Sequence, residues 1–166
     1  GGRARVLWAA PADASPPWPA ATDATTWNWL EVQAGVPRVV ARTAEAFVPQ
    51  MVNLELVGGV NFKKGCYPGQ EIVARSQYRG TVKRRMVLVE GEAAPEAGTE
   101  VFSPAEPDQP AGQVVLSASL AGGRHAALVE VKRALVDGGE FHAGAADGPR
   151  LAVRELPYAL PAIDAE

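Results

Sequence analysis

Four short runs of mostly aliphatic residues in the second half of the chain constrain its fold most strongly. They cover residues 85–89, 113–117, 125–131 and 151–155. Segments rich in glycine and proline separate them, at 103–110, 122–123, 138–139 and 144–148. Short strands joined by such turns are typical of a small antiparallel barrel or sandwich. We therefore expect an α+β chain, in which a small α/β segment (residues 1–80) precedes a C-terminal antiparallel β-barrel (residues 81–166).

A helix is expected between a proline-rich connector, residues 9–21, and the break at Gly35. Asp23 is suited to the N-cap because its carboxylate can accept hydrogen bonds from the first free backbone N–H groups. Gly35 is suited to the carboxyl end, where a left-handed conformation is common. Three residues at helical spacing are expected to form the core-facing side, namely Trp27, Leu30 and Ala34.

The composition is ordinary for a soluble globular protein, with 47% hydrophobic and 21% charged residues among 166. No apolar run approaches the roughly 20 residues that cross a bilayer, and the first residues lack the apolar core of a secretory signal. The one cysteine, Cys66, cannot form an internal disulfide, which agrees with a reducing compartment. We therefore expect a cytoplasmic protein that does not associate with membranes.

The start of the chain suggests that it is a piece of a longer protein. It begins inside a strand-like run, residues 5–8, and contains only two methionines, Met51 and Met86. We expect a C-terminal portion, with part of any binding site outside this sequence.

Charge is distributed unevenly around a net value of -3. Residues 63–85 carry a net charge of +6 and the rest of the chain -9. A positive segment in an acidic chain points to an anionic ligand or partner. For any single residue, a solvated helix face or strand edge is the stronger interpretation. The segment has one acid, Glu71, and seven basic residues: Lys63, Lys64, Arg75, Arg79, Lys83, Arg84 and Arg85.

Cys66 lies just before a predicted helix that begins at Pro68 and ends at Gly80. Proline is suited to the first helical position, where its missing N–H costs nothing. The helix dipole, Lys63 and Lys64 would lower the pKa of the thiol. Such a thiolate could attack an electrophile, ligate iron or zinc, or form a mixed disulfide. The alternative is that Cys66 is a small buried hydrophobe and the lysines are ordinary surface residues.

Residues around Cys66 suit a binding segment. Gly65 and Gly69 tolerate positive φ and allow a ligand to approach closely. One face of the predicted helix carries Glu71, Arg75 and Arg79, so that Glu71 can pair with Arg75. No second cysteine or metal motif accompanies Cys66, so no metal site is predicted. The two histidines, His125 and His142, are interpreted as ordinary barrel residues.

The segment 63–75, Lys-Lys-Gly-Cys-Tyr-Pro-Gly-Gln-Glu-Ile-Val-Ala-Arg, resembles the signature of the YgfZ family of folate-binding proteins. Residues 47–50, 53–54 and 78–80 add to the match, and weaker similarity extends from about Trp27 to Tyr158. That family is related in fold to the aminomethyltransferase, or T-protein, of the glycine cleavage system. The resemblance implies that residues 1–80 are the C-terminal part of a folate-binding region in a ring-like, multidomain protein.

The resemblance further implies a protein that binds tetrahydrofolate and supports the assembly or repair of iron-sulfur enzymes. Client enzymes that thiomethylate tRNA are the implied partners, and family members are not established as enzymes. Cys66 would be the reactive thiol. T-proteins typically lack this cysteine, so Cys66 favours the assembly role. The implied folate-binding residues of the segment are Lys64, Gly65, Tyr67, Gly69, Gln70, Glu71, Arg75 and Arg79.

Glu31 is a further folate-binding candidate. In T-proteins, a glutamate in a Leu-Glu-x-x-Ala-Gly context binds the pterin, and residues 30–35 stand in that place. A carboxylate can accept two parallel N–H bonds from the pterin, as it does from arginine. The alternative is a solvent-facing helix glutamate.

Two other functions remain open from the sequence. One is aminomethyl transfer on tetrahydrofolate, which rests on kinship of fold. The other is RNA binding through the basic residues between Arg75 and Arg85. It is weakened because Tyr78 is the only aromatic residue among them, so we expect no direct binding of nucleic acid.

Overall fold

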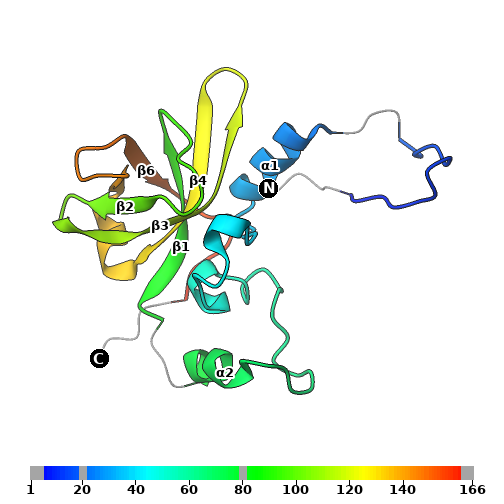
Figure 1. The fold of residues 1–166 in the computed structure, drawn as a ribbon, viewed down its shortest axis with the longest axis horizontal. Helices are drawn as coiled ribbons and strands as arrows, with labels where there is room; N and C mark the ends of the chain where they lie inside the picture. The colour runs from blue at the N-terminus through cyan, green and yellow to red at the C-terminus, as the bar shows by residue number, and fades with distance from the viewer. Residues whose placement is uncertain (1–5, 19–21, 79–81, 162–166) are drawn as a thin grey trace.

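The structure is a computed structural model that describes residues 6–18, 22–78 and 82–161 (Figure 1). Six antiparallel strands close into a barrel in the order β1-β4-β3-β2-β5-β6. One α-helix covers part of the barrel wall, and a second lies apart from the barrel, below it in Figure 1. The α+β class and the predicted C-terminal barrel are confirmed.

The barrel strands have the following bounds: β1 Arg84–Gly91, β2 Glu100–Ser103, β3 Glu106–Leu120, β4 Arg124–Lys132, β5 Glu140–Ala143 and β6 Arg150–Arg154. A 3₁₀ helix, η3 (Arg133–Gly138), connects β4 to β5. Closure depends on β1, which pairs with β4 on one side and β6 on the other. Each predicted apolar run therefore forms or overlaps one of the strands β1, β3, β4 and β6.

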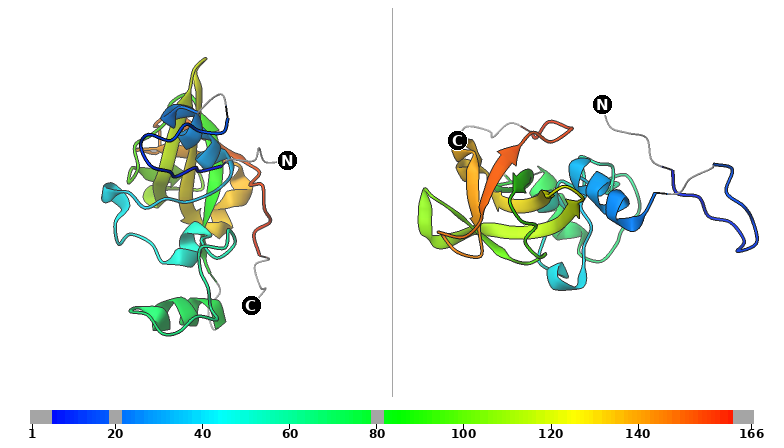
Figure 2. Two further views of the ribbon diagram at one scale, coloured as in Figure 1. Left: turned by 90° about the vertical axis from the view of Figure 1, so that its right-hand side faces the viewer. Right: turned by 90° about the horizontal axis from the view of Figure 1, so that it is seen from above.

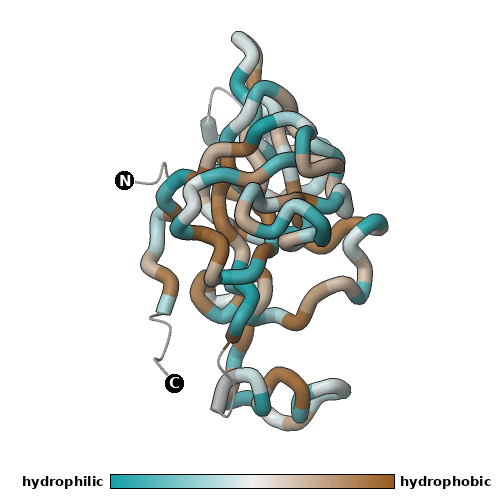
Figure 3. Tube along the Cα trace, turned by 90° about the vertical axis from the view of Figure 1, so that its left-hand side faces the viewer, coloured by the Kyte–Doolittle hydropathy of each residue, from teal (hydrophilic) through white to brown (hydrophobic). Residues whose placement is uncertain are grey.

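Two apolar clusters explain why the runs are continuous rather than alternating. Side chains point to opposite faces along a strand, so a strand covered on both faces needs apolar residues at every position. In β1, Val87 and Val89 point into the barrel, whereas Met86 and Leu88 join the outer cluster under the helix. Figure 3 shows hydrophobic stretches running through the centre of the barrel.

The structure adds two strands that the sequence did not predict and corrects one turn. The added strands, β2 and β5, have four residues each. The prediction that 103–110 is a turn-rich separator is confirmed only at residues 104–105, which form the turn between β2 and β3, because β3 begins at Glu106 and includes Pro107 and Pro110. These prolines are tolerated because two register shifts interrupt the pairing of β2 with β3 there.

Helix α1 (Ala24–Gln33) confirms the predicted element and its caps. Asp23 Oδ1 accepts the Thr26 backbone N–H at 2.7 Å, and Gly35 follows the helix with φ of 65°. The predicted core-facing side of Trp27, Leu30 and Ala34 is wrong. Trp29 and Val32 are the buried residues, packed on β3 and β4, and Leu30 only borders the cluster.

Between α1 and the barrel, the chain forms short 3₁₀ turns, η1 (Ala41–Thr43) and η2 (Pro49–Val52), and then an irregular stretch leading to α2 (Gln70–Tyr78). The right-hand view of Figure 2 shows the described residues before α1 extending beyond the body of the molecule. Residues 6–18 contain no helix or strand, in agreement with the predicted connector; the strand-like run at 5–8 is not a strand over its described residues 6–8.

Candidate functional site

The Cys66 segment turns sharply before α2. The Gln70 N–H donates to Tyr67 O at 3.2 Å, with Pro68 and Gly69 at the two central positions and Gly69 at φ 78°. Proline followed by a residue at positive φ is the signature of a type II turn. Tyr67 N–H also donates to Gln70 Oε1 at 3.3 Å. The segment therefore enters the helix through a turn fixed by Pro68, Gly69 and Gln70.

This turn corrects the predicted helix start. The helix begins at Gln70 rather than Pro68, so Cys66 lies a full turn away from the helical N–H groups. The predicted helix end at Gly80 lies outside the described residues, as does Arg79.

Cys66 is exposed, and so are its neighbours Lys63, Lys64 and Gly65. The alternative that Cys66 is a small buried hydrophobe is therefore wrong. A side chain added at Gly65 would meet no atom within 4 Å, and φ there is not positive, so the chain needs no glycine at this point for its own packing. The thiol is open to molecules that approach from solvent.

A cavity of about 290 Å³ lies beside the thiol-bearing loop. Lys64 Nζ is 4.6 Å from the centroid of the Tyr67 ring, a distance at which a cation is attracted to the ring face. Asn61 Oδ1 accepts the Lys63 backbone N–H at 2.8 Å, which shapes the loop. We call this the Lys64 cavity; its lining residues are Pro49, Leu54, Gly58, Gly59, Val60, Asn61, Lys64 and Tyr67.

Helix α2 presents charged residues to solvent and one apolar residue to the protein. Glu71 and Arg75 are exposed, whereas Val73 is buried against η2. The ion pairs of the described residues do not include the possible Glu71–Arg75 pair. Both side chains are thus presented on the surface of the helix that follows the Cys66 segment.

A buried group of polar side chains joins α2 to the barrel. Gln50 Nε2 donates to Val73 O in α2 at 2.8 Å, and Arg85 Nη1 of β1 donates to Gln50 O at 2.8 Å. Arg85 also forms an ion pair with Glu55, and both side chains are buried. Asn53 Nδ2 donates to Met86 O at 2.7 Å. We call Gln50, Asn53, Glu55, Arg85 and Tyr158 the polar junction.

Tyr158 connects the polar junction to two distant parts of the chain. Its hydroxyl donates to Gly35 O at 2.7 Å and lies 3.4 Å from Asn53 Nδ2. Burial raises the pKa of Tyr158 above its ordinary value of 10.0. The end of α1, η2 and the segment after β6 therefore meet at one hydroxyl.

The polar junction also changes the interpretation of the basic segment. Arg85 is neutralised by Glu55, and Arg84 forms an ion pair with Glu130 that raises the pKa of the guanidinium. Two of the seven basic residues therefore support the fold. Lys63 and Lys64, which precede Cys66 in the same loop, remain exposed, and so do Arg75 on α2 and Lys83 before β1.

The sequence did not predict that the residues of the polar junction would come together. A glutamine, an asparagine and a glutamate within six residues, at positions 50, 53 and 55, stand among apolar residues. Arg85 is the first residue of the otherwise apolar run of β1, residues 85–89. Polar residues in apolar surroundings are the available signal, because burial requires that they find partners.

The structure separates Glu31 from the Cys66 segment. Glu31 is half-buried on α1, and the views in Figures 1 and 2 place α1 and α2 apart. The predicted folate-binding residues therefore fall into two places: one residue on α1, and the group Lys64, Gly65, Tyr67, Gly69, Gln70, Glu71 and Arg75 around the Cys66 turn.

Within the described residues, no three His, Cys, Asp or Glu side chains gather where they could hold a metal ion. Among the same residues, no helix is long and apolar enough to cross a membrane.

Comparison with known proteins identifies a relative. No protein-family model matches the chain. The chain is 40% identical over 144 residues to the tRNA-modifying protein YgfZ of Photobacterium profundum, an alignment that covers 84% of the chain. It spans only 43% of that relative's length. With 40% identity over most of its length, the chain belongs to the YgfZ family.

Proposed function

We propose that the chain is part of a folate-dependent accessory protein that supports iron-sulfur enzymes, among them those that modify tRNA. The observation that carries the proposal is the exposed Cys66 thiol, held on a turn beside the Lys64 cavity. Membership of the YgfZ family supports it, as does the name of the relative, a tRNA-modifying protein.

The chemistry of the Lys64 cavity fits one end of a reduced folate. A folate ends in glutamate carboxylates joined to an aromatic ring. Lys64 supplies a positive charge for a carboxylate, and Tyr67 supplies a ring face. At about 290 Å³, the cavity lies near the lower limit of small-molecule sites, so it suits part of the ligand rather than the whole.

Glu31 fits the other end, because a half-buried carboxylate can accept paired N–H groups of a pterin. Since α1 and α2 lie apart, we propose that the two groups of residues contribute separately and that the remainder of the family's length completes the pocket. When bound, the folate would supply a one-carbon carrier. The residues of this chain would bind and orient it, and Cys66 would face the client enzyme.

The test uses the full-length protein and its cellular function. We expect reduced folate to bind the wild type and Cys66→Ser alike in isothermal titration, because Cys66 is placed toward the client. In cells that contain only Cys66→Ser, we expect thiomethylated tRNA to fall severalfold by mass spectrometry. Unchanged thiomethylation in those cells would contradict the role of the thiol.

Lysine variants test the cavity. Lys64→Gln should weaken folate binding about tenfold or less, the loss of one exposed charge contact. Lys83→Gln is the matched control, because Lys83 is also exposed but lies outside the cavity. Equal effects of the two variants would show that Lys64 acts only through net charge. Transfer of a one-carbon unit in a glycine-cleavage exchange assay would favour the aminomethyltransferase hypothesis instead.

A further inference from the structure

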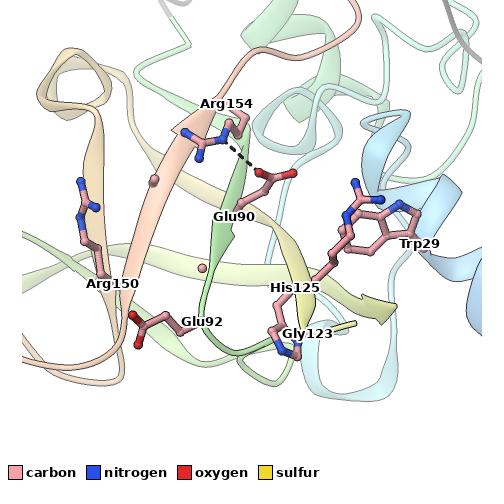
Figure 4. A pocket seen from close by; sticks show the side chains of 10 residues that line it. Trp29, Glu90, Glu92, Gly123, His125, Arg150 and Arg154 are labelled. Carbon is pink, nitrogen blue, oxygen red and sulfur yellow. Dashed lines mark hydrogen bonds and ion pairs between the residues drawn. The ribbon is translucent and has the colours of Figure 1, made fainter. Parts of the chain in front are cut away.

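A second hollow, of about 380 Å³, lies on the outer wall of the barrel, away from the Cys66 turn. It is formed where β1, β4 and β6 run side by side next to the carboxyl half of α1, and Figure 4 shows its side chains. We call it the arginine hollow. The side chains that line it include Trp29, Glu90, Arg124, His125, Arg150 and Arg154.

The register of the strands creates the space. Glu90 on β1 is paired with Ala126 of β4 and Ala152 of β6, so its two neighbours across the sheet are short. The next residue is Gly91, where an added Cβ would lie 2.5 Å from Arg150 O. Small residues therefore form the floor, and long charged side chains form the rim.

Two of the three arginines are held in place by carboxylates. Arg154 Nε lies 3.1 Å from Glu90 Oε2, the contact drawn in Figure 4, and Arg150 forms an ion pair with Glu140. A guanidinium has five N–H donors, so these pairs leave donors of both side chains for a ligand. Figure 4 shows Arg150 and Trp29 on opposite sides of the hollow.

The third arginine forms a flat surface. The Arg124 guanidinium lies 4.7 Å from the centroid of the Trp29 ring, and Arg124 is exposed. One face of the guanidinium is thus backed by an aromatic ring, and a second planar group can stack on the other face. His125 stands beside it, with Nδ1 2.8 Å from Ser119 Oγ.

The charges define the ligand class. Glu90 and Glu92 line the same hollow, so the guanidinium charges are largely offset and a bare anion gains little. The side chains of the hollow would all find a partner in a ligand that combines three groups. These are an anionic group for Arg150 and Arg154, a planar ring for Arg124, and amino groups for the carboxylates. We propose that the arginine hollow binds a nucleotide, with its base on Arg124 and its phosphate at Arg150 and Arg154.

The experiment titrates the full-length protein with AMP, a short single-stranded RNA, inorganic phosphate and reduced folate, following Trp fluorescence and calorimetry. We expect AMP or the RNA to bind, and Arg124→Lys to weaken binding at least about fivefold, since it keeps the charge but removes the stacking plane. Arg150→Ala should also weaken it. Arg42→Ala is the matched control, an exposed arginine paired with Glu96 outside the hollow.

Comparing AMP with the RNA shows whether the bound nucleotide is free or part of an RNA strand. Tighter binding of RNA than of AMP, with a steep salt dependence, would identify the nucleotide as part of an RNA strand. Equal affinities would identify a free nucleotide. The proposal is overturned if neither binds, if phosphate alone binds as well as AMP, if Arg124→Lys has no effect, or if folate displaces AMP. Only the last outcome concerns the folate proposal, which otherwise stands independently.

Discussion

At the scale of single residues, the turn before α2 distinguishes two glycines of one motif. Gly69 has φ of 78°, a conformation that other residues adopt only with strain. Gly65 has no such φ and has open space where a Cβ would point. The two positions differ in physical requirement although both flank Cys66 closely.

We expect Gly69→Ala to destabilise the turn and the start of α2 by about 1–2 kcal/mol, the cost of a left-handed conformation for alanine. Gly65→Ala is the control and should change stability by less than about 0.5 kcal/mol. Hydrogen exchange of the α2 amides measures the local opening free energy in each variant. Equal protection of α2 in the two variants would refute this account of the turn.

Residue patterns predicted the caps of α1 but not its buried face. Asp23 and Gly35 act through local hydrogen bonds and φ, which depend on adjacent residues. The buried face depends on the barrel. Tryptophans at positions 27 and 29 give this ten-residue helix two possible apolar sides, and only packing on β3 and β4 selects Trp29.

At the scale of elements, α2 depends on few contacts with the rest of the molecule. Val73 is its buried apolar residue among those whose side chains are described, and Gln50 donates to the carbonyl of the same residue. The position of the Cys66 turn therefore depends on a glutamine 16 residues earlier in the sequence.

We expect Gln50→Met to reduce hydrogen-exchange protection of α2 and to change the alkylation rate of Cys66, because it removes the Nε2 donor at similar volume. The loss of one buried hydrogen bond corresponds to about 1–3 kcal/mol of local stability. Gln33→Met is the matched control, since Gln33 Nε2 is buried without a hydrogen-bond partner. If both variants leave α2 equally protected, Gln50 does not position the turn.

Element lengths explain which strands were predictable. The runs in β1 and β4 are long and apolar on both faces, so they stand out in the sequence. The four-residue strands β2 and β5 contain too few apolar residues to show a period. The first half of β3 contains prolines that indicate a turn, and only its pairing with β2 makes it a strand. Glu140 and His142 lie two positions apart on β5 and therefore on the same face of the strand, and Glu140 Oε1 lies 3.1 Å from His142 Nε2.

At the scale of the whole molecule, Tyr158 holds together three segments that are distant in sequence. Its hydroxyl reaches Gly35 after α1 and Asn53 after η2. Gly35 is also required sterically, because an added Cβ would lie 2.8 Å from Tyr158 Oη. The segment after the last strand thereby returns to the first helix.

We expect Tyr158→Phe to lower the free energy of unfolding by about 1 kcal/mol at neutral pH, measured by denaturant titration. Because burial raises the folded-state pKa of Tyr158, its ionisation in the unfolded state comes first. The contribution of the protonated Tyr158 hydroxyl to the free energy of unfolding is complete below pH 10, and it is lost as the pH rises from there toward the folded-state pKa. The wild type should therefore lose more stability than Tyr158→Phe as the pH rises above about 10; parallel losses would argue against a buried hydroxyl.

The closed barrel has a consequence for assembly. Each described strand has a strand neighbour on both sides, because β6 returns to β1. Free edges are therefore limited to short stretches, such as residues 84–87 of β1 on the side of β6 and residues 106–111 of β3 on the side of β4. Such short stretches offer few backbone N–H and C=O groups for strand addition, the usual route to sheet-mediated aggregation. Partners that meet this half of the molecule should recognise mainly side chains, turns and loops, and specificity for them can change by surface substitution without disturbing the backbone ladder.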